Sequence, residues 1–145
     1  MKKTNDEQKE YLLLKIKSPS GVDFYSDHKA VIDRCGYVDF AKVGNSVLKT
    51  ELLKAGDIIY IKESVVNGGA LYAATLKEVV ENGKEFPAYY NDLEIANVFW
   101  LRLSDIKPIE NKDYLDGFET RAGGKVSGAL KSMSPNFYIR KRAKK

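Results

Sequence analysis

Short apolar segments, most of them alternating with polar residues, dominate this 145-residue chain. A period of two is typical of β-strands, and an unbroken apolar run of similar length is typical of a strand buried on both faces. Glycine, asparagine, serine and proline separate these segments, as expected of turns. The pattern predicts strands at residues 11–17, 57–62, 70–80, 97–103 and 137–139, with a brief strand or extended loop at 35–40.

Helices are predicted in fewer places. Ser26 and Asp27 can cap a helix over residues 28–34, because their side chains accept hydrogen bonds from the first helical N–H groups. A second helix is expected over residues 47–54, ending at the Gly56 stop signal. A single helical turn is expected at residues 111–116.

Strands therefore outnumber helices, and short connections such as Asn67-Gly68-Gly69 join neighbouring strands. This order predicts an α+β fold with a curled mixed sheet, or a small β-barrel, and short helices. The run at residues 11–17 is apolar enough to be a central strand. We expect one domain over residues 11–139, a flexible N-terminus at 1–10 and a basic tail at 140–145.

Composition limits the classes of protein. The chain is 43% hydrophobic and 30% charged, as in ordinary globular proteins. No apolar run approaches the ~20 residues that span a membrane. Cys35 is the only cysteine and His28 the only histidine, which excludes an intrachain disulfide and a His/Cys zinc site in a monomer. We expect a cytoplasmic protein with no metal, no cofactor and no membrane partner.

Charge changes this picture more than composition does. Residues 120–145 contain eight basic residues and no Asp or Glu, although the net charge of the whole chain is only +4. Such asymmetry indicates a polyanionic partner. For residues 140–145 alone, a solubilising tail is an equal alternative. The predicted phosphate-binding residues are Lys125, Lys131, Arg140, Lys141 and Arg142.

The sequence offers little support for catalysis. His28 and Cys35 are interpreted as a solvated surface histidine and a buried structural cysteine, because a helix end separates them. The carboxylates are scattered, and no glycine-rich phosphate motif is present. No catalytic residue is assigned.

The aromatic residues are more informative, because many fall in strands and loops. Unstacked bases bind aromatic faces, at about 1–3 kcal/mol per base. Tyr60, Tyr72 and Phe99 are interpreted as core residues. Strand alternation places Trp100 on the face opposite Phe99, which favours Trp100 as a pocket wall. Tyr37, after Gly36, is a second candidate of this kind.

Three stretches give the chain a family resemblance. Residues 11–15 are similar to the aromatic-led first strand of EVE and YTH domains. Residues 54–64 and 70–79 are similar to the Gly-Asp strand and following hairpin of EVE and ASCH domains. Residues 98–109 resemble their Trp-bearing strand and the Asp-x-x-Pro turn after it. In their order and spacing, these stretches resemble the PUA-like superfamily.

The resemblance implies a pocket that holds a modified base in an aromatic cage. Carried over to this sequence, and combined with the aromatic candidates, the base-pocket residues are Trp100, Tyr37, Phe40, Asp39, Asn45 and Ser64. Two departures matter: the second cage tryptophan of YTH domains is absent, and the Lys, Thr and Glu of ASCH hydrolases are not evident. The second departure counts against an enzyme.

The leading hypothesis is a non-enzymatic nucleic-acid-binding domain that reads a modified or flipped nucleobase in DNA or RNA. A flipped base leaves its stack at a cost of a few kcal/mol. The basic end would then bind the flanking phosphates. A small interaction module or inhibitor that binds an acidic protein surface is the alternative. A small nucleoside amidohydrolase is the third hypothesis.

Overall fold

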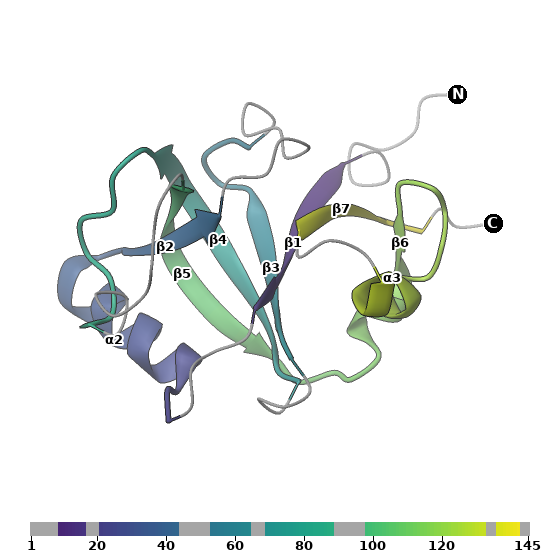
Figure 1. Cartoon of the computed structure of the whole chain (residues 1–145), viewed down its shortest axis with the longest axis horizontal. Helices are drawn as coiled ribbons and strands as arrows, with labels where there is room; N and C mark the ends of the chain where they lie inside the picture. The colour runs from purple at the N-terminus through teal and green to yellow at the C-terminus, as the bar shows by residue number, and fades with distance from the viewer. Residues whose placement is uncertain are drawn as a thin grey trace. The chain divides into compact units, whose positions relative to one another are not determined.

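The computed structural model describes residues 9–16, 21–43, 53–64, 69–88, 98–132 and 136–142. Its fold is α+β, with a mixed seven-stranded sheet in the order β2-β5-β4-β3-β1-β7-β6 (Figure 1). The two edge strands are β2 and β6, so the sheet is open and the alternative of a closed barrel is wrong. The strands are β1 Glu10–Ile16, β2 Val38–Val43, β3 Ile58–Glu63, β4 Leu71–Val80, β5 Val98–Ile109, β6 Phe118–Thr120 and β7 Asn136–Lys141.

The contacts of the chain divide it into two compact units. The first unit comprises residues 1–17, 59–72 and 109–145, and the second unit comprises residues 18–58 and 73–108. The first unit holds the 3₁₀-helix η4 (Tyr114–Gly117) and the helix α3 (Val126–Ser132), and the second unit holds the helix α2 (Phe24–Cys35).

In the second unit, α2 begins earlier than predicted. Asp23, and not the pair Ser26 and Asp27, caps the helix: the Asp23 side chain accepts a hydrogen bond from the Ser26 N–H at 3.0 Å. The helix ends at Gly36, whose left-handed φ of 86° suits glycine and whose N–H bonds the Ile32 carbonyl. The strand expected at residues 35–40 therefore begins only at Val38.

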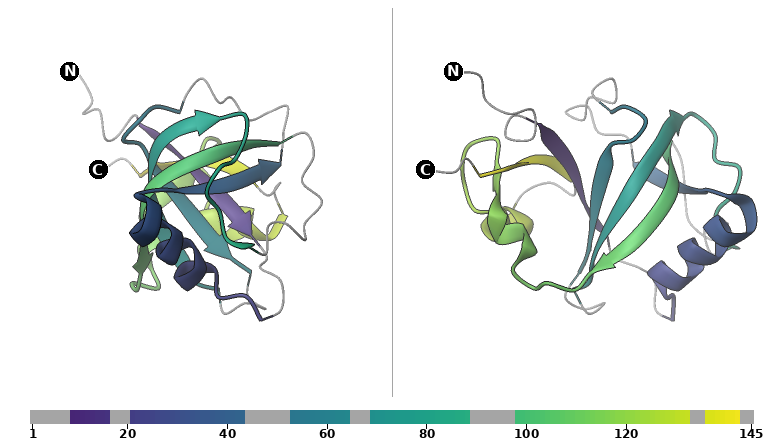
Figure 2. Two further views of the ribbon diagram at one scale, coloured as in Figure 1. Left: turned by 90° about the vertical axis from the view of Figure 1, so that its left-hand side faces the viewer. Right: turned by 180° about the vertical axis from the view of Figure 1, so that it is seen from behind.

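One face of α2 packs against β2, as Figure 2 shows. Phe24 lies 5.9 Å from Phe40 between ring centroids, and His28 lies 6.0 Å from Phe40. His28 is completely buried, which contradicts the prediction of a solvated surface histidine. The physical reason is helical spacing: His28 is four residues after buried Phe24, so both residues share the inner face. Val31 is also buried on this helix, whereas Ala30 is exposed.

The strand β5 extends six residues beyond the predicted end at residue 103. The expected turn around Asp105 and Pro108 is therefore wrong. Leu101, Leu103 and Ile106 are all fully buried. The step of three residues from Leu103 to Ile106 breaks the period of two, so the pattern falsely indicates an end. Pro108 lies near the end of the strand, where a missing N–H is tolerated.

In the first unit, β1 runs parallel to β3 and antiparallel to β7. Residues 11–14 are buried, which confirms a strand buried on both faces. The strand β7 is longer than predicted, because Arg140 pairs with Glu10 of β1 and with Glu119 of β6. Arg140 and Lys141 thus belong to a strand and not to a tail.

Aromatic side chains fill part of the core of the first unit. The Tyr60 and Phe118 ring centroids are 5.5 Å apart, and those of Tyr11 and Tyr60 are 5.7 Å apart. The Tyr60 and Tyr114 hydroxyls are hydrogen-bonded at 2.6 Å. Tyr114 comes from η4, a single helical turn that begins three residues later than the turn predicted at residues 111–116.

Two sequence predictions lie mainly outside the described residues. These are the helix over residues 47–54, of which Leu53 and Lys54 are described and are not helical, and the turn at residues 67–69. The expected stop at Gly56 is a turn, in which Gly56 has a φ of 93°. Among the described helices, none has the length and apolar character needed to cross a bilayer.

Candidate functional site

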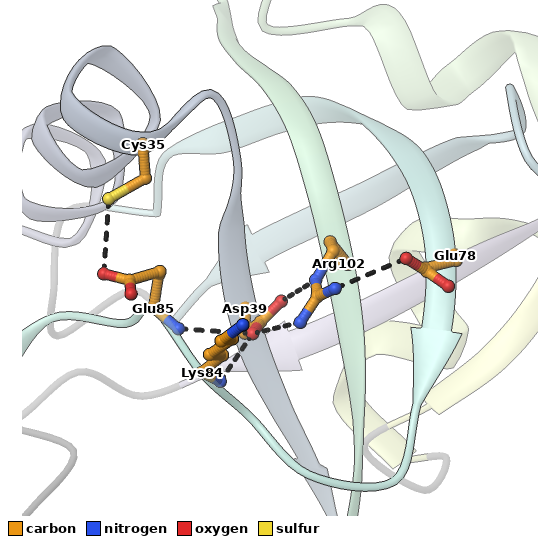
Figure 3. Close-up of polar contacts among 6 residues, drawn as sticks. All are labelled: Cys35, Asp39, Glu78, Lys84, Glu85 and Arg102. Carbon is orange, nitrogen blue, oxygen red and sulfur yellow. Dashed lines mark hydrogen bonds and ion pairs between the residues drawn. The ribbon is translucent and has the colours of Figure 1, made fainter.

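Two of the predicted pocket residues, Tyr37 and Asp39, contact Arg102 in the second unit. Asp39 and Arg102 are direct partners in the β2–β5 register. Arg102 donates from Nε to Asp39 Oδ1 at 2.8 Å and from a terminal nitrogen to Asp39 Oδ2 at 3.1 Å (Figure 3). The Asp39 side chain is fully buried, and 15% of the Arg102 side chain is exposed. Arg102 was not predicted as a site residue. A cation within an apolar strand, two residues after Trp100, does indicate that a buried acidic partner is nearby.

The Asp39 carboxylate also holds the segment that follows β4. Its Oδ2 accepts hydrogen bonds from the backbone N–H groups of Lys84 at 2.7 Å and Glu85 at 3.3 Å (Figure 3). With the two bonds from Arg102, four donors occupy a carboxylate that offers about four lone-pair sites. In this arrangement Asp39 fastens residues 84 and 85 to β2, and its oxygens are engaged within the protein.

Arg102 has further partners on either side. Its guanidinium lies 4.4 Å from the centroid of the Tyr37 ring, and it contacts Glu78 of β4 at 3.3 Å. The hydrogen bonds to Asp39 raise the pKa of Arg102 further above its ordinary value. The cluster is thus a fixed ionic network in which Tyr37 packs against a permanent cation. At its other end, the Cys35 thiol donates to Glu85 at 3.2 Å (Figure 3).

Trp100 is covered by the segment that Asp39 holds. Only 8% of its surface is exposed, and its ring is stacked on Phe86 with a centroid distance of 5.1 Å. Gly83 lies directly against the indole, because a Cβ at Gly83 would be 2.5 Å from a ring atom. Access to the indole face therefore requires this segment to move.

Of the remaining predicted pocket residues, Phe40 is placed away from Trp100. Phe40 is opposite Leu101 in the register, so alternation places it on the other face of the strand pair, against Phe24. Ser64 belongs to the first unit, where its N–H bonds the Ile16 carbonyl. Asn45 lies outside the described residues.

Basic residues of the first unit lie around the short edge strand β6, and strand alternation directs Arg140 and Lys141 to opposite faces of the sheet. We call this set the β6 surface: Arg121, Lys125, Arg140, Lys141 and Arg142. Arg140 and Lys141 pair with β6 through β7, and Lys125 forms an isolated bridge with Glu119. Arg142 bonds to the carbonyls of Gly117 and Phe118. Arg121 directly follows the strand.

The β6 surface includes two arginines that pair with carboxylates and three cations that pair with no carboxylate of the described ranges. Arg140 pairs with Glu119 at 2.7 Å, and Arg121 pairs with Glu10 at 2.6 Å. The others, Lys125, Lys141 and Arg142, are exposed, and no carboxylate among the described residues forms an ion pair with them. Lys131, in the last turn of α3, is also exposed but lies outside this set.

The charge of the chain is segregated between the units. The first unit contains 15 Lys and Arg against 8 Asp and Glu, whereas the second contains 9 against 12. The β6 surface therefore belongs to a unit with a net charge of +7, and the Arg102 cluster belongs to one with a net charge of −3.

Within the described ranges, no group of three or more His, Cys, Asp or Glu is placed to hold a metal ion. Comparison with protein-family models, characterised proteins and solved structures finds no significant match. The PUA-like resemblance therefore stays a prediction.

Proposed function

We propose that this protein binds nucleic acid and that the β6 surface contacts the phosphate backbone. The observation that carries the proposal is a set of three exposed cations, Lys125, Lys141 and Arg142, around one short strand; no carboxylate in the described part of the chain pairs with them. Lysine and arginine bind phosphates by releasing condensed counterions, which does not require a deep cavity.

The distribution of charge supports the same conclusion. A uniformly basic protein would attract polyanions over its whole surface, whereas here the excess of positive charge belongs to the first unit alone. Such asymmetry orients a polyanion towards one part of the chain. The base pocket expected from the sequence around Trp100 would require Gly83 and Phe86 to move off the indole, because these residues cover its ring.

The test is a titration of fluorescein-labelled DNA and RNA oligonucleotides, single-stranded and duplex, at several KCl concentrations between about 50 and 200 mM. The triple variant Lys125→Ala, Lys141→Ala, Arg142→Ala should bind more weakly. Its plot of log K against log salt should be flatter by about 0.7 to 0.9 for each phosphate that the variant no longer binds. Lys107→Ala removes an exposed lysine of the second unit and serves as the matched control.

Two outcomes contradict the proposal. One is the absence of oligonucleotide binding at the lowest salt concentration, together with binding of polyglutamate, which would favour an acidic protein partner. The other is a triple variant whose affinity and salt dependence equal those of Lys107→Ala.

A further inference from the structure

Arg121 differs from the other cations of the β6 surface, because two neighbours fix the plane of its guanidinium. Its Nε and a terminal nitrogen donate to the two oxygens of Glu10 at 2.6 and 2.8 Å. The guanidinium carbon lies 4.6 Å from the centroid of the Tyr138 ring. The bidentate pair fixes one edge of the group, and its carbon lies over the Tyr138 ring.

The sheet supplies both of these neighbours. Glu10 and Tyr138 come from the paired strands β1 and β7, where Glu10 is opposite Arg140 and Leu12 is opposite Tyr138. Arg121 begins the turn after β6, which is closed by hydrogen bonds between Thr120 and Gly124 and between Gly123 and Thr120. Three adjacent strands thus determine where this side chain lies.

The pairing leaves Arg121 poorly suited to act as one more phosphate ligand. Glu10 offsets its charge and uses two of its five N–H donors. Glu10 also raises the pKa of Arg121 above its ordinary value, so the group stays a planar cation. Tyr138 contacts the guanidinium on one side, and 49% of the Arg121 side chain is exposed to solvent, so part of the group is open to a ligand.

An immobilised guanidinium plane beside phosphate-binding lysines matches the chemistry of an unpaired nucleotide. Bases that are not stacked in a duplex pack on aromatic rings and on arginine planes in protein complexes with single strands. We propose that the exposed face of Arg121 stacks an unpaired nucleobase whose flanking phosphates contact Lys125 and its neighbours on the β6 surface. This inference rests on the proposed nucleic-acid binding and deepens it: the substrate is single-stranded, and its bases take part.

The test compares a fluorescein-labelled single-stranded oligoadenylate with an abasic oligomer of the same length, using full-length protein. Arg121→Lys keeps the charge but removes the plane. We expect this variant to bind oligoadenylate about 5- to 100-fold more weakly than wild type, and the abasic oligomer with less than a two-fold change. Lys125→Ala should weaken both oligomers equally. Arg34→Lys, on an exposed part of α2, is the control for loss of a guanidinium elsewhere.

A second variant keeps the inference testable if Arg121→Lys unfolds. Glu10→Gln retains Tyr138 and Arg121 but loosens the bidentate pair. It should reduce the preference for oligoadenylate over the abasic oligomer while increasing the affinity for the abasic one. Equal effects of Arg121→Lys on both oligomers, or no effect on either, would overturn the stacking role while leaving phosphate binding intact. Failure of wild type to bind any oligomer would overturn both proposals.

Discussion

The guanidinium of Arg102 and the carboxylate of Asp39 are 63 residues apart in sequence and are joined by two hydrogen bonds across β2 and β5. Asp39 is fully buried, so the pair is isolated from solvent on the carboxylate side. Because the same carboxylate holds the backbone of Lys84 and Glu85, the pair links the strand register to the segment that covers Trp100.

Asp39→Asn should therefore destabilise the protein strongly. The change leaves a largely buried guanidinium with only the exposed Glu78 as its acidic partner, which costs about 3 kcal/mol of unfolding free energy. Urea unfolding monitored by tryptophan fluorescence measures the loss of unfolding free energy. Asp33→Asn breaks the exposed pair with Lys29 and should produce a much smaller shift in midpoint. Similar shifts for the two variants would contradict the structural role of Asp39.

Stability should fall on acidification because of His28. Burial lowers its pKa from 6.5 to about 4, although the hydrogen bond to the Phe24 carbonyl opposes the shift. Between these pH values the unfolded chain binds a proton that the folded protein excludes, so stability falls as the pH decreases from 6.5 towards 4. The full loss is roughly 3 kcal/mol. The measurement is the melting temperature of wild type and of His28→Gln at several pH values across this range. If the two proteins lose stability in parallel, His28 is not the group responsible.

Gly83→Ala tests the contact with Trp100. A Cβ 2.5 Å from a ring atom cannot be accommodated without displacing the segment, so we expect a loss of about 1–3 kcal/mol and a changed tryptophan emission spectrum. Gly128→Ala in α3 is the matched control, since a Cβ there meets no atom within 4 Å. Alanine should stabilise that helix by up to about 1 kcal/mol. An unchanged spectrum in Gly83→Ala would refute close packing of this segment on the indole.

Tyr60 predicts a second pH effect, at alkaline values. Burial, followed by the hydrogen bond to Tyr114, raises the pKa of Tyr60 above its ordinary value of 10. The folded protein keeps a proton that the unfolded chain releases, so stability should fall as the pH rises beyond 10. In Tyr60→Phe this alkaline loss should be smaller, at a cost near neutrality of about 1 kcal/mol. Melting temperatures at pH 8 and about pH 11 distinguish the two proteins; Tyr37→Phe serves as a control.

Local patterns predicted much of the sheet. The apolar run before Ile16 and the alternation from Ile58 onward correspond to β1 and β3. Burial of a strand on one or both faces produces a regular pattern of apolar residues in the sequence. The strand β6 and the helix α3 were missed. Both are very short, and their buried residues Phe118 and Val126 form no pattern long enough to count. The end of β5 was predicted too early for a related reason: the alternation of apolar and polar residues changes phase after Leu103.

The candidate site was harder to predict, because its electrostatics depend on distant partners. Counting residues 120–145 as purely basic overlooked Glu10, which lies 111 residues from Arg121 and neutralises it through the pairing of β1 with β7. The same applies to Asp39: its type suggested a base contact, whereas its partner Arg102 becomes visible only once the β2–β5 register is known.

The placement of β1 between β3 and β7 also has a consequence for how the chain folds during synthesis. β1 is made first, but one of its two hydrogen-bonding partners spans residues 136–141. Closing so long a loop is entropically costly and slows folding. While the ribosome is still producing the intervening residues, one side of this apolar strand lacks its partner and is open to aggregation. We therefore expect a chaperone that shields nascent apolar strands to improve the yield of this protein more than extra time for refolding does.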